Sequence, residues 1–191
     1  MNSTPRLILG SGSPRRSEIL TSMGYDFEVI VPSVEESSND NLGLTNLSIY
    51  NAELKARATW NLVPDNNHIV IASDTVVWLD GVSFGKPTSV EHAHEMLSKL
   101  SGKTHQVGTG VSVQTAEKNY SFCEVAHVTF KKLSLQEIIQ YVKDIWVMDK
   151  AGAYSIQEES ERIIEAFDGE YETIMGLPKA RLNDTLKQLK L

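Results

Sequence analysis

Apolar residues follow two patterns along this chain: short continuous runs, and longer segments in which they recur every three or four positions. Continuous runs bounded by polar residues or glycine predict buried strands. The most apolar run, residues 68–78, is expected to be a central strand, and Asp80-Gly81 after it predicts a tight turn into a partner strand. Strands are expected over residues 6–10, 27–31, 68–78, 82–84, 104–115 and 120–131.

The segments with three-to-four spacing predict helices that each bury one face. In the first of them, Ser13 is expected to be the N-cap, Pro14 the first helical residue and Gly24 the terminator. Residues 134–137 have the sequence of a capping box, whereas the polar stretch 33–45 shows neither pattern and is expected to be a loop. Helices are expected to begin at Pro14, to cover residues 46–62 and 89–100, to begin again after Ser134, and to run from Pro178 to Leu191.

Strands and helices therefore interleave, and an antiparallel pair of long strands, residues 104–115 and 120–131, lies in the middle of the order. This order predicts an α/β fold with a mixed sheet. A chain of 191 residues suits one domain, or two lobes that share a cleft, and no linker or internal repeat divides it. We expect a single domain over residues 1–191.

The charge and the cysteine content narrow the classes of function. The net charge is −7, from 18 basic and 25 acidic residues, so nucleic-acid binding is disfavoured as the main activity. A small phosphorylated ligand needs only a local cationic pocket. The single cysteine, Cys123, fits a reducing compartment. No apolar run has the length of a membrane span or of a signal peptide, so a cytoplasmic protein is expected.

The segment Ser11 to Arg16, with the sequence Ser-Gly-Ser-Pro-Arg-Arg, is the first candidate for chemistry, because a predicted strand turns into a predicted helix there. The start of a helix offers free backbone N–H groups and the positive end of the helix dipole, which favour a phosphate. The two arginines add forked donors that match phosphate geometry. Local sequence fits a capped helix with two solvated arginines equally well, so both interpretations stand.

Asp74 is the second candidate, since it lies inside the most apolar run between Ser73 and Thr75. Burial of a carboxylate is costly in free energy unless the group is paired or binds a metal. We therefore interpret Asp74 as a metal ligand or a general base rather than as a carboxylate that only accepts backbone hydrogen bonds.

Three further features are weak by themselves. Lys86 lies in an expected turn and Lys55 on an expected helix, where a lysine is ordinarily solvated. Small residues in the segment 149–157 allow close backbone packing, and the amide of Gln157 has both a donor and an acceptor with which to read the edge of a base. The spacing of the histidines does not fit a structural zinc site.

Taken in order, these segments resemble the Maf family of nucleoside triphosphate pyrophosphatases over nearly the whole chain. The resemblance implies an elongated α/β fold of the Maf/ITPase-like type, with a mixed sheet flanked by helices and two lobes around a central cleft. The segment 150–157 resembles the branch that acts on dTTP and UTP rather than the branch that prefers 7-methyl-GTP. The matching segments are residues 11–16, 35–36, 55–56, 74–77, 85–87, 100–102 with His105, 150–157 and 176–178.

The resemblance also implies a reaction, which is the hydrolysis of dTTP and UTP to the nucleoside monophosphate and pyrophosphate. Modified pyrimidine nucleotides are implied as further substrates, in a house-cleaning role. Family members are often homodimers, so a homodimer that acts on a nucleotide, without a nucleic-acid or membrane partner, is expected.

Individual residues match functional positions of the family. By resemblance, Asp74 is the catalytic base. Further active-site positions are matched by Glu36, Lys55 and Lys86. Positions that mark substrate preference are matched by Arg15, Thr75 and Gln157.

The resemblance and the physical argument together give a hypothesis for the mechanism. Asp74 and Glu36 hold Mg²⁺ or Mn²⁺ and orient water toward the α phosphorus, while Lys55 and Lys86 add positive charge. The phosphate groups are held at the helix start by Ser11, Ser13, Arg15 and Arg16.

The chain departs from the family pattern at two places. Ser73 replaces the more frequent alanine, and Glu158 and Glu159 follow Gln157 where glycine is usual.

Two alternative functions stay open. One alternative is a pyrophosphatase for another modified nucleotide, which would keep the mechanism and change the base. The other is a nucleotide-binding regulator of cell division with little turnover, which has no need of a buried carboxylate base.

Overall fold

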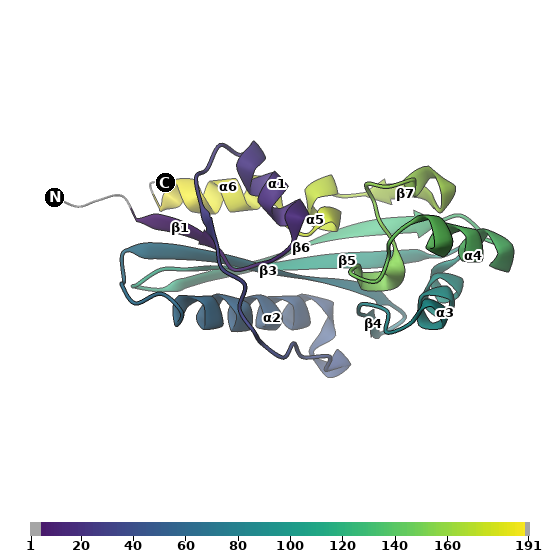
Figure 1. Cartoon of the computed structure of the whole chain (residues 1–191), viewed down its shortest axis with the longest axis horizontal. Coiled ribbons are helices and arrows are strands. Elements are labelled where there is room, and N and C mark those ends of the chain that lie inside the picture. The colour runs from purple at the N-terminus through teal and green to yellow at the C-terminus, as the bar shows by residue number, and fades with distance from the viewer. Residues whose placement is uncertain (1–4, 190–191) are drawn as a thin grey trace.

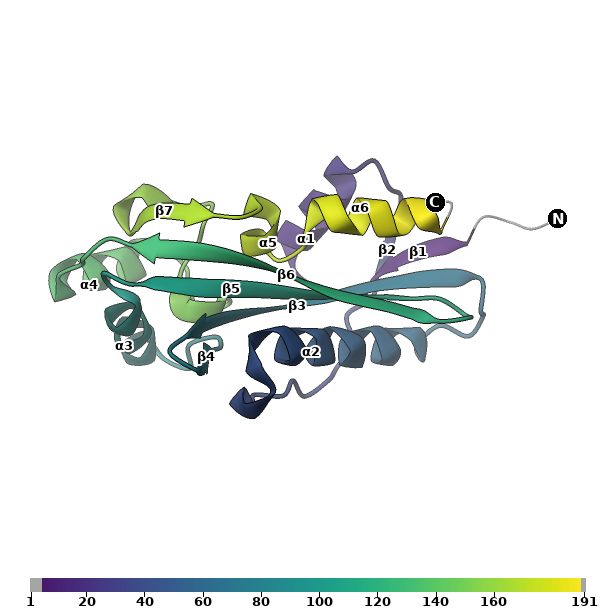
Figure 2. The ribbon, with the colours of Figure 1, turned by 180° about the vertical axis from the view of Figure 1, so that it is seen from behind.

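One mixed sheet runs the length of the elongated molecule, and helices cover both of its faces (Figures 1 and 2). The computed structural model describes residues 5–189, so the expected helical residues Lys190 and Leu191 lie outside the described residues. Within residues 5–189 the strands are β1 (Arg6–Leu9), β2 (Glu28–Val29), β3 (His68–Leu79), β4 (Val82–Phe84), β5 (Thr104–Gln114), β6 (Asn119–Phe130) and β7 (Ile164–Asp168). The helices are α1 (Pro14–Ser22), α2 (Gly43–Trp60), α3 (Val90–Leu100), α4 (Leu135–Asp144), α5 (Tyr171–Met175) and α6 (Lys179–Gln188), with 3₁₀ turns η1 (Asp40–Leu42), η2 (Ala151–Ala153) and η3 (Ser160–Arg162). None of the helices described is long and apolar enough to cross a membrane.

The strand order is β2-β1-β3-β5-β6-β7, and β4 pairs with one end of β3. β1 runs parallel to β2 and β3, whereas the other pairs are antiparallel. The prediction of an α/β fold with a mixed sheet and a long antiparallel pair is therefore confirmed. Asp80 and Gly81 have φ values of 52° and 86°, which the predicted tight turn between β3 and β4 requires.

Helix α2 lies on one face of the sheet, and α1, α5 and α6 lie on the other (Figure 1). The backbone of α2 approaches β5 so closely that a Cβ atom on Gly110 would lie 2.3 Å from the carbonyl group of Ser48. Glycine at this position lets the helix rest directly on the strand. Because α2 also carries Lys55, this contact fixes how that lysine faces β3.

The buried apolar side chains form two main clusters. One includes Phe130 and Tyr141 and lies between the sheet and helices α3 and α4. The other includes Leu20 and Leu182 and lies between the sheet and helices α1 and α6. These clusters form the cores of two lobes, as the family resemblance implies.

Several element boundaries differ from the predicted ones. The loop predicted over residues 33–45 ends at Asn39, because the side chain of Asn39 accepts a hydrogen bond from Asn41 and caps η1, and α2 follows at Gly43. The strand predicted over residues 27–31 is reduced to the two residues of β2. The sequence does not predict β7, because β7 buries only its first residue and therefore has no apolar run.

The three helix ends predicted from capping residues agree with the structure in position. Ser134 and Glu137 form both hydrogen bonds of the predicted capping box at the start of α4. Gly24 adopts a positive φ of 83° just after α1. Ser13 occupies the N-cap position of α1 with extended backbone and Pro14 is the first helical residue, as expected, but the Ser13 side chain makes no capping hydrogen bond.

The pairing of β3 is interrupted along one edge. β5 pairs with residues 70–78 of β3 on one side, but on the other side β1 pairs with residues 68–71 and β4 with residues 77–79. No strand among residues 5–189 pairs with β3 residues 72–76 on that second side. Successive side chains of a strand point to opposite faces, so this gap makes Asp74, toward α2, and Thr75, toward α1, accessible from one opening.

Candidate active site

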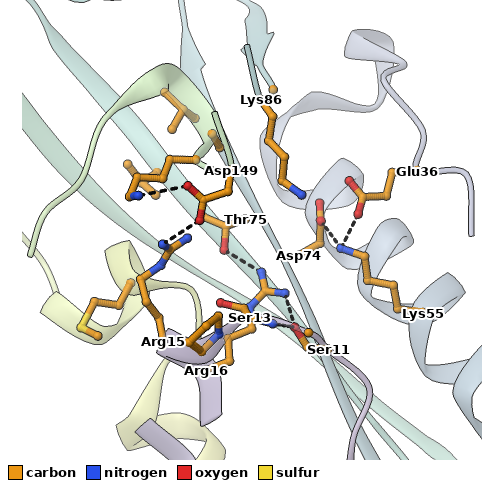
Figure 3. A pocket seen from close by; sticks show the side chains of 18 of the residues that line it. Ser11, Ser13, Arg15, Arg16, Glu36, Lys55, Asp74, Thr75, Lys86 and Asp149 are labelled. Atoms are coloured by element: carbon orange, nitrogen blue, oxygen red, sulfur yellow. Dashed lines mark hydrogen bonds and ion pairs between the residues drawn. The ribbon is translucent and has the colours of Figure 1, made fainter. Parts of the chain in front are cut away.

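A pocket of about 410 Å³ lies where the pairing of β3 is interrupted. Its walls come from the β1–α1 turn, the loop before η1, α2, β3, the turn after β4 and the segment around η2 (Figure 3). Nine of the ten predicted site residues line it: Ser11, Ser13, Arg15, Arg16, Glu36, Lys55, Asp74, Thr75 and Lys86. The structure does not bring Gln157 into this lining; its side chain is exposed, one residue beyond the lining residue Ile156.

Asp74 is 5% exposed, and both of its carboxylate oxygens have partners. Oδ1 lies 2.6 Å from Nζ of Lys55, and Oδ2 accepts a hydrogen bond of 3.1 Å from Nδ2 of Asn51. A carboxylate buried to this extent needs such partners, as the sequence argument expects. The two contacts together fix the orientation of the carboxylate group at the wall of the pocket.

Lys55 lies between two carboxylates, one from a strand and one from a loop. Its Nζ is 2.6 Å from Asp74 Oδ1 and 2.7 Å from Glu36 Oε1 (Figure 3). The side chains of Lys55 and Asp74 are 11% and 7% exposed, whereas that of Glu36 is 44% exposed. Lys55 is therefore a buried cation that draws the Glu36 loop toward Asp74, with Glu36 facing the solvent side.

Asn51 is a site residue that the sequence analysis does not identify. It is buried one helical turn before Lys55 on the same face of α2. Its Oδ1 accepts a hydrogen bond of 2.8 Å from the backbone N–H of Ser37, and its Nδ2 donates to the Ser37 carbonyl and to Asp74, each at 3.1 Å. One amide thus ties the loop beside Glu36 to Asp74. The signal in the sequence is an amide at i−4 from Lys55, on a helix face that turns out to be buried.

The β1–α1 turn forms the opposite wall, and Arg16 connects it to the rest of the site. Arg16 donates from Nη1 to Ser11 Oγ at 3.0 Å, from Nε to the Gly176 carbonyl at 3.0 Å and from Nη2 to Thr75 Oγ1 at 3.3 Å. Burial lowers the pKa of Arg16 below its ordinary value, against the raising effect of Asp74. Arg16 therefore donates to three groups of the protein itself, and these contacts use much of the guanidinium that the sequence predicts will bind phosphate.

Ser11 and Ser13 both lie at the start of α1. Ser11 Oγ accepts a hydrogen bond of 3.3 Å from the backbone N–H of Ser13. Because the side chain of Ser13 makes no capping hydrogen bond, the N–H groups of the first turn of α1 keep their capacity to bind an anion in the pocket.

The wall facing Arg15 comes from the segment around η2. Arg15 Nη1 lies 3.6 Å from Asp149 Oδ2, and Lys150 Nζ lies 3.0 Å from Asp149 Oδ1. Partial burial acts to raise the pKa of Asp149, but the hydrogen bond from Lys150 and the charges of Lys150 and Arg15 together lower it. Tyr154, which also lines the pocket, is hydrogen-bonded through its hydroxyl to His105 Nε2 at 2.9 Å.

The structure also places the residues that depart from the family pattern. Ser73 is buried, and its hydroxyl donates a hydrogen bond of 2.9 Å to the Gly176 carbonyl, to which Arg16 also donates. Glu158 and Glu159 are exposed, do not line the pocket and form ion pairs with Lys150 and Arg162, respectively. Neither glutamate therefore places its charge inside the pocket.

The pocket supplies the local positive charge that an acidic chain needs to bind a phosphorylated ligand. Its charged lining residues are the basic Arg15, Arg16, Lys55, Lys86 and Lys150 and the acidic Glu36, Asp74 and Asp149. Lys86 is exposed and forms no ion pair with any residue of the described range, so its charge is available to a ligand.

Of the three carboxylates that line the pocket within residues 5–189, Glu36 and Asp74 converge on one point, whereas Asp149 pairs with two basic residues on another wall. The described residues contain no group of three or more His, Cys, Asp or Glu side chains that could hold a metal ion. Mg²⁺ at nucleotide sites is usually bound by one or two carboxylates together with substrate phosphates. Two carboxylates that already converge on a cation, the Lys55 ammonium, fit this donor set.

Comparisons with known proteins identify the family of the chain. The profile of the family described as Maf-like protein matches residues 6–189. The chain is 46% identical over 187 residues to a protein of Phocaeicola vulgatus named dTTP/UTP pyrophosphatase, with 96% of each chain covered. It is 40% identical over 188 residues to a protein of the same name from Bacillus velezensis, with 98% of each covered.

Among solved structures, the Ham1 protein of Staphylococcus aureus is similar in fold. The TM-score is 0.54 and the sequence identity 16%, and the match covers 94% of this chain and 99% of that one. At this identity the similarity concerns the fold alone, and it agrees with the predicted Maf/ITPase-like architecture.

Proposed function

The chain belongs to the Maf-like protein family, and from this premise we propose that it hydrolyses dTTP and UTP to the nucleoside monophosphate and pyrophosphate. Relatives that share 40–46% of its sequence over nearly full length are named for this activity. The observation that carries the proposal is the arrangement of Glu36, Lys55 and Asp74 at the edge of a pocket rich in cations. A buried carboxylate next to phosphate-binding groups is what hydrolysis of a phosphoanhydride requires.

Asp74 is the proposed general base. It accepts a proton from a water molecule, the water oxygen attacks the α phosphorus, and the bond from the α phosphorus to the bridging oxygen breaks, so that pyrophosphate leaves. Lys55 and Asn51 hold the carboxylate in one orientation through contacts of 2.6 and 3.1 Å. Little reorganisation is then needed during the reaction.

The phosphate groups are proposed to lie against the start of α1. The first N–H groups of this helix and the guanidinium of Arg15 donate to phosphate oxygens, and Lys86 adds charge from the turn after β4. Arg16, which is bound to Ser11 and Thr75, supports this wall from behind. These groups stabilise the negative charge that develops on the phosphate oxygens.

A divalent cation, Mg²⁺ or Mn²⁺, is proposed as the cofactor. Glu36 and Asp74 would hold it together with the substrate phosphates, in agreement with the donor set of the pocket. When bound, such an ion acts as a Lewis acid on the phosphate oxygens. Preference for the pyrimidine base is assigned to Arg15, Thr75 and Gln157, as the family resemblance implies; Arg15 and Thr75 line the pocket, whereas Gln157 does not.

Pyrophosphate release from a panel of nucleoside triphosphates, with Mg²⁺, with Mn²⁺ and with a chelator, tests the proposal. We expect metal-dependent release from dTTP and UTP and weak release from purine nucleotides. Release from other triphosphates only would keep the mechanism and replace the substrate by another modified nucleotide. Binding of nucleotides without any release would instead support a regulator of cell division.

A homodimer and a cytoplasmic location are proposed along with the activity. The family resemblance supports the first, and the single cysteine supports a reducing compartment for the second. Size-exclusion chromatography with light scattering distinguishes a dimer from a monomer of 21.2 kDa.

A further inference from the structure

Three hydrogen bonds connect the side chains of Arg16, Thr75 and Thr109 and the backbone carbonyl of Thr173 in a series. The chemistry of the groups determines which one is the donor in each bond. Thr109, fully buried on β5, has its Oγ1 2.7 Å from the backbone carbonyl of Thr173. A carbonyl has no hydrogen to give, so the Thr109 hydroxyl is the donor there. That hydroxyl has only one hydrogen, which is now committed.

The remaining two bonds follow from the first. Thr75 Oγ1 lies 2.9 Å from Thr109 Oγ1, and because Thr109 has no hydrogen left, Thr75 is the donor in this contact. Arg16 Nη2 lies 3.3 Å from Thr75 Oγ1, and a guanidinium only donates. The series of donors therefore runs from Arg16 to Thr75, from Thr75 to Thr109 and from Thr109 to the Thr173 carbonyl.

Thr75 consequently has no hydrogen to offer to the pocket that it lines. One of its two lone pairs accepts from Arg16, and the other remains for a ligand. Any ligand group that hydrogen-bonds to Thr75 must be a donor. The series ends on the backbone carbonyl of Thr173 in α5, which can only accept a hydrogen bond. The packing of α5 against β5 therefore sets the direction of all three hydrogen bonds.

We propose that Thr109 is a positioning residue for base selection, because it takes the only hydrogen of the Thr75 hydroxyl and so leaves Thr75 as an acceptor that recognises the N3–H group of uracil or thymine. This inference rests on the proposed function. The Watson–Crick edge of uracil and thymine has one donor, N3–H, between two carbonyl acceptors. Cytosine has an unprotonated N3 at the same place, so two lone pairs would face each other and the base would be rejected.

The matched variants are Thr109→Val, which removes the hydroxyl and nearly keeps the shape, and Thr109→Ser, which keeps the hydroxyl. In Thr109→Val, the Thr75 hydroxyl is free to rotate and donate to N3 of cytosine. We expect the ratio of kcat/KM for UTP to kcat/KM for CTP to fall roughly 2- to 10-fold, the range that one ordinary hydrogen bond is worth. Thr109→Ser should retain the wild-type ratio.

Binding of the non-hydrolysable α,β-methylene analogues of UTP and CTP, measured by calorimetry, separates this inference from the proposed activity. If the wild-type protein releases no pyrophosphate from UTP, the proposed function fails, and the ratio of the two affinities still decides the role of Thr109. An unchanged ratio in folded Thr109→Val, or equal affinity of the wild-type protein for both analogues, would overturn the inference. If Thr109→Val does not fold, Thr75→Val decides: it removes the acceptor, and a retained preference for the UTP analogue overturns the inference equally.

Discussion

Lys55 Nζ and Asp74 Oδ1 lie 2.6 Å apart, and both residues are less than a tenth exposed. The pair connects helix α2 to the stretch of β3 that lacks a strand partner on one side within the described residues. The pair therefore has two roles: it holds α2 against β3, and it orients the Asp74 carboxylate in the pocket. Substitutions of the two residues distinguish these roles.

Replacing Asp74 by Asn should reduce kcat for pyrophosphate release from dTTP by roughly 10²- to 10⁴-fold, the range that a general base contributes. The fold should persist, because asparagine has the same shape and Lys55 keeps its contact of 2.7 Å with Glu36. Circular dichroism and thermal melting check the fold. Asp168→Asn, an exposed change on β7, is the control and should retain activity. Near-normal turnover by Asp74→Asn would place the base elsewhere.

Replacing Lys55 by Met should destabilise the protein by about 3 kcal/mol, since it leaves a buried carboxylate without its counter-charge. Urea unfolding at neutral pH measures the loss. The double variant Lys55→Met/Asp74→Asn should recover much of it, because no buried charge is then unpaired. Lys103→Met is the matched control: its ion pair with Asp80, at 3.3 Å, is exposed and should be worth roughly 0–1 kcal/mol. Equal effects of the two lysine variants would contradict a buried role for Lys55.

Asn51 is expected to act on turnover through Asp74 and the Glu36 loop rather than on nucleotide binding. Asn51→Leu removes a hydrogen bond to a charged group, which is worth about 1.5–3 kcal/mol, so kcat should fall roughly 10- to 100-fold with little change in KM. Asn51→Asp should be worse, because it places a second negative charge against Asp74. Steady-state kinetics with dTTP distinguish these outcomes. An increase in KM with unchanged kcat would show that Asn51 serves binding instead.

The parts of the site that the sequence predicts are those whose chemistry is visible in a short segment. An aspartate within the apolar run 68–78 implies a buried carboxylate, and serines with two arginines at a strand-to-helix turn imply an anion site. The only local signal of Asn51 is its position one helical turn before Lys55, and Thr109 carries none. Their partners lie 23 residues away in Asp74 and 64 residues away in Thr173, and only tertiary packing brings these groups together.

The same distinction holds for the fold. Strands that are buried, such as β3, have apolar runs and are predicted almost to the residue. β7 lies at the edge of the sheet and exposes four of its five residues, so its sequence has no period to detect. The exposed side chain of Gln157 shows a further limit, because resemblance identifies a position in a family pattern and not the direction of a side chain.

His105 should make the stability of the protein depend on pH in the acidic range. It is 1% exposed, its Nδ1 has no hydrogen-bond partner among the described residues, and burial lowers its pKa from 6.5 to about 4. The unfolded chain therefore binds a proton that the native protein does not bind between these two values. The stabilising contribution is fully present above pH 6.5 and is lost as the pH falls toward 4.

By linkage, this single group should remove about 2 kcal/mol of stability between about pH 7.5 and about pH 5. Other groups also titrate in this range, so the informative quantity is the difference between wild type and His105→Gln in urea unfolding at both pH values. The variant cannot bind the proton, and its free energy of unfolding should fall by about 2 kcal/mol less than that of the wild type over the same interval. His127→Gln, an exposed histidine on β6, should keep the wild-type pH dependence. Identical pH dependence in His105→Gln and the wild type would mean that His105 is protonated as readily in the native state as in the unfolded chain.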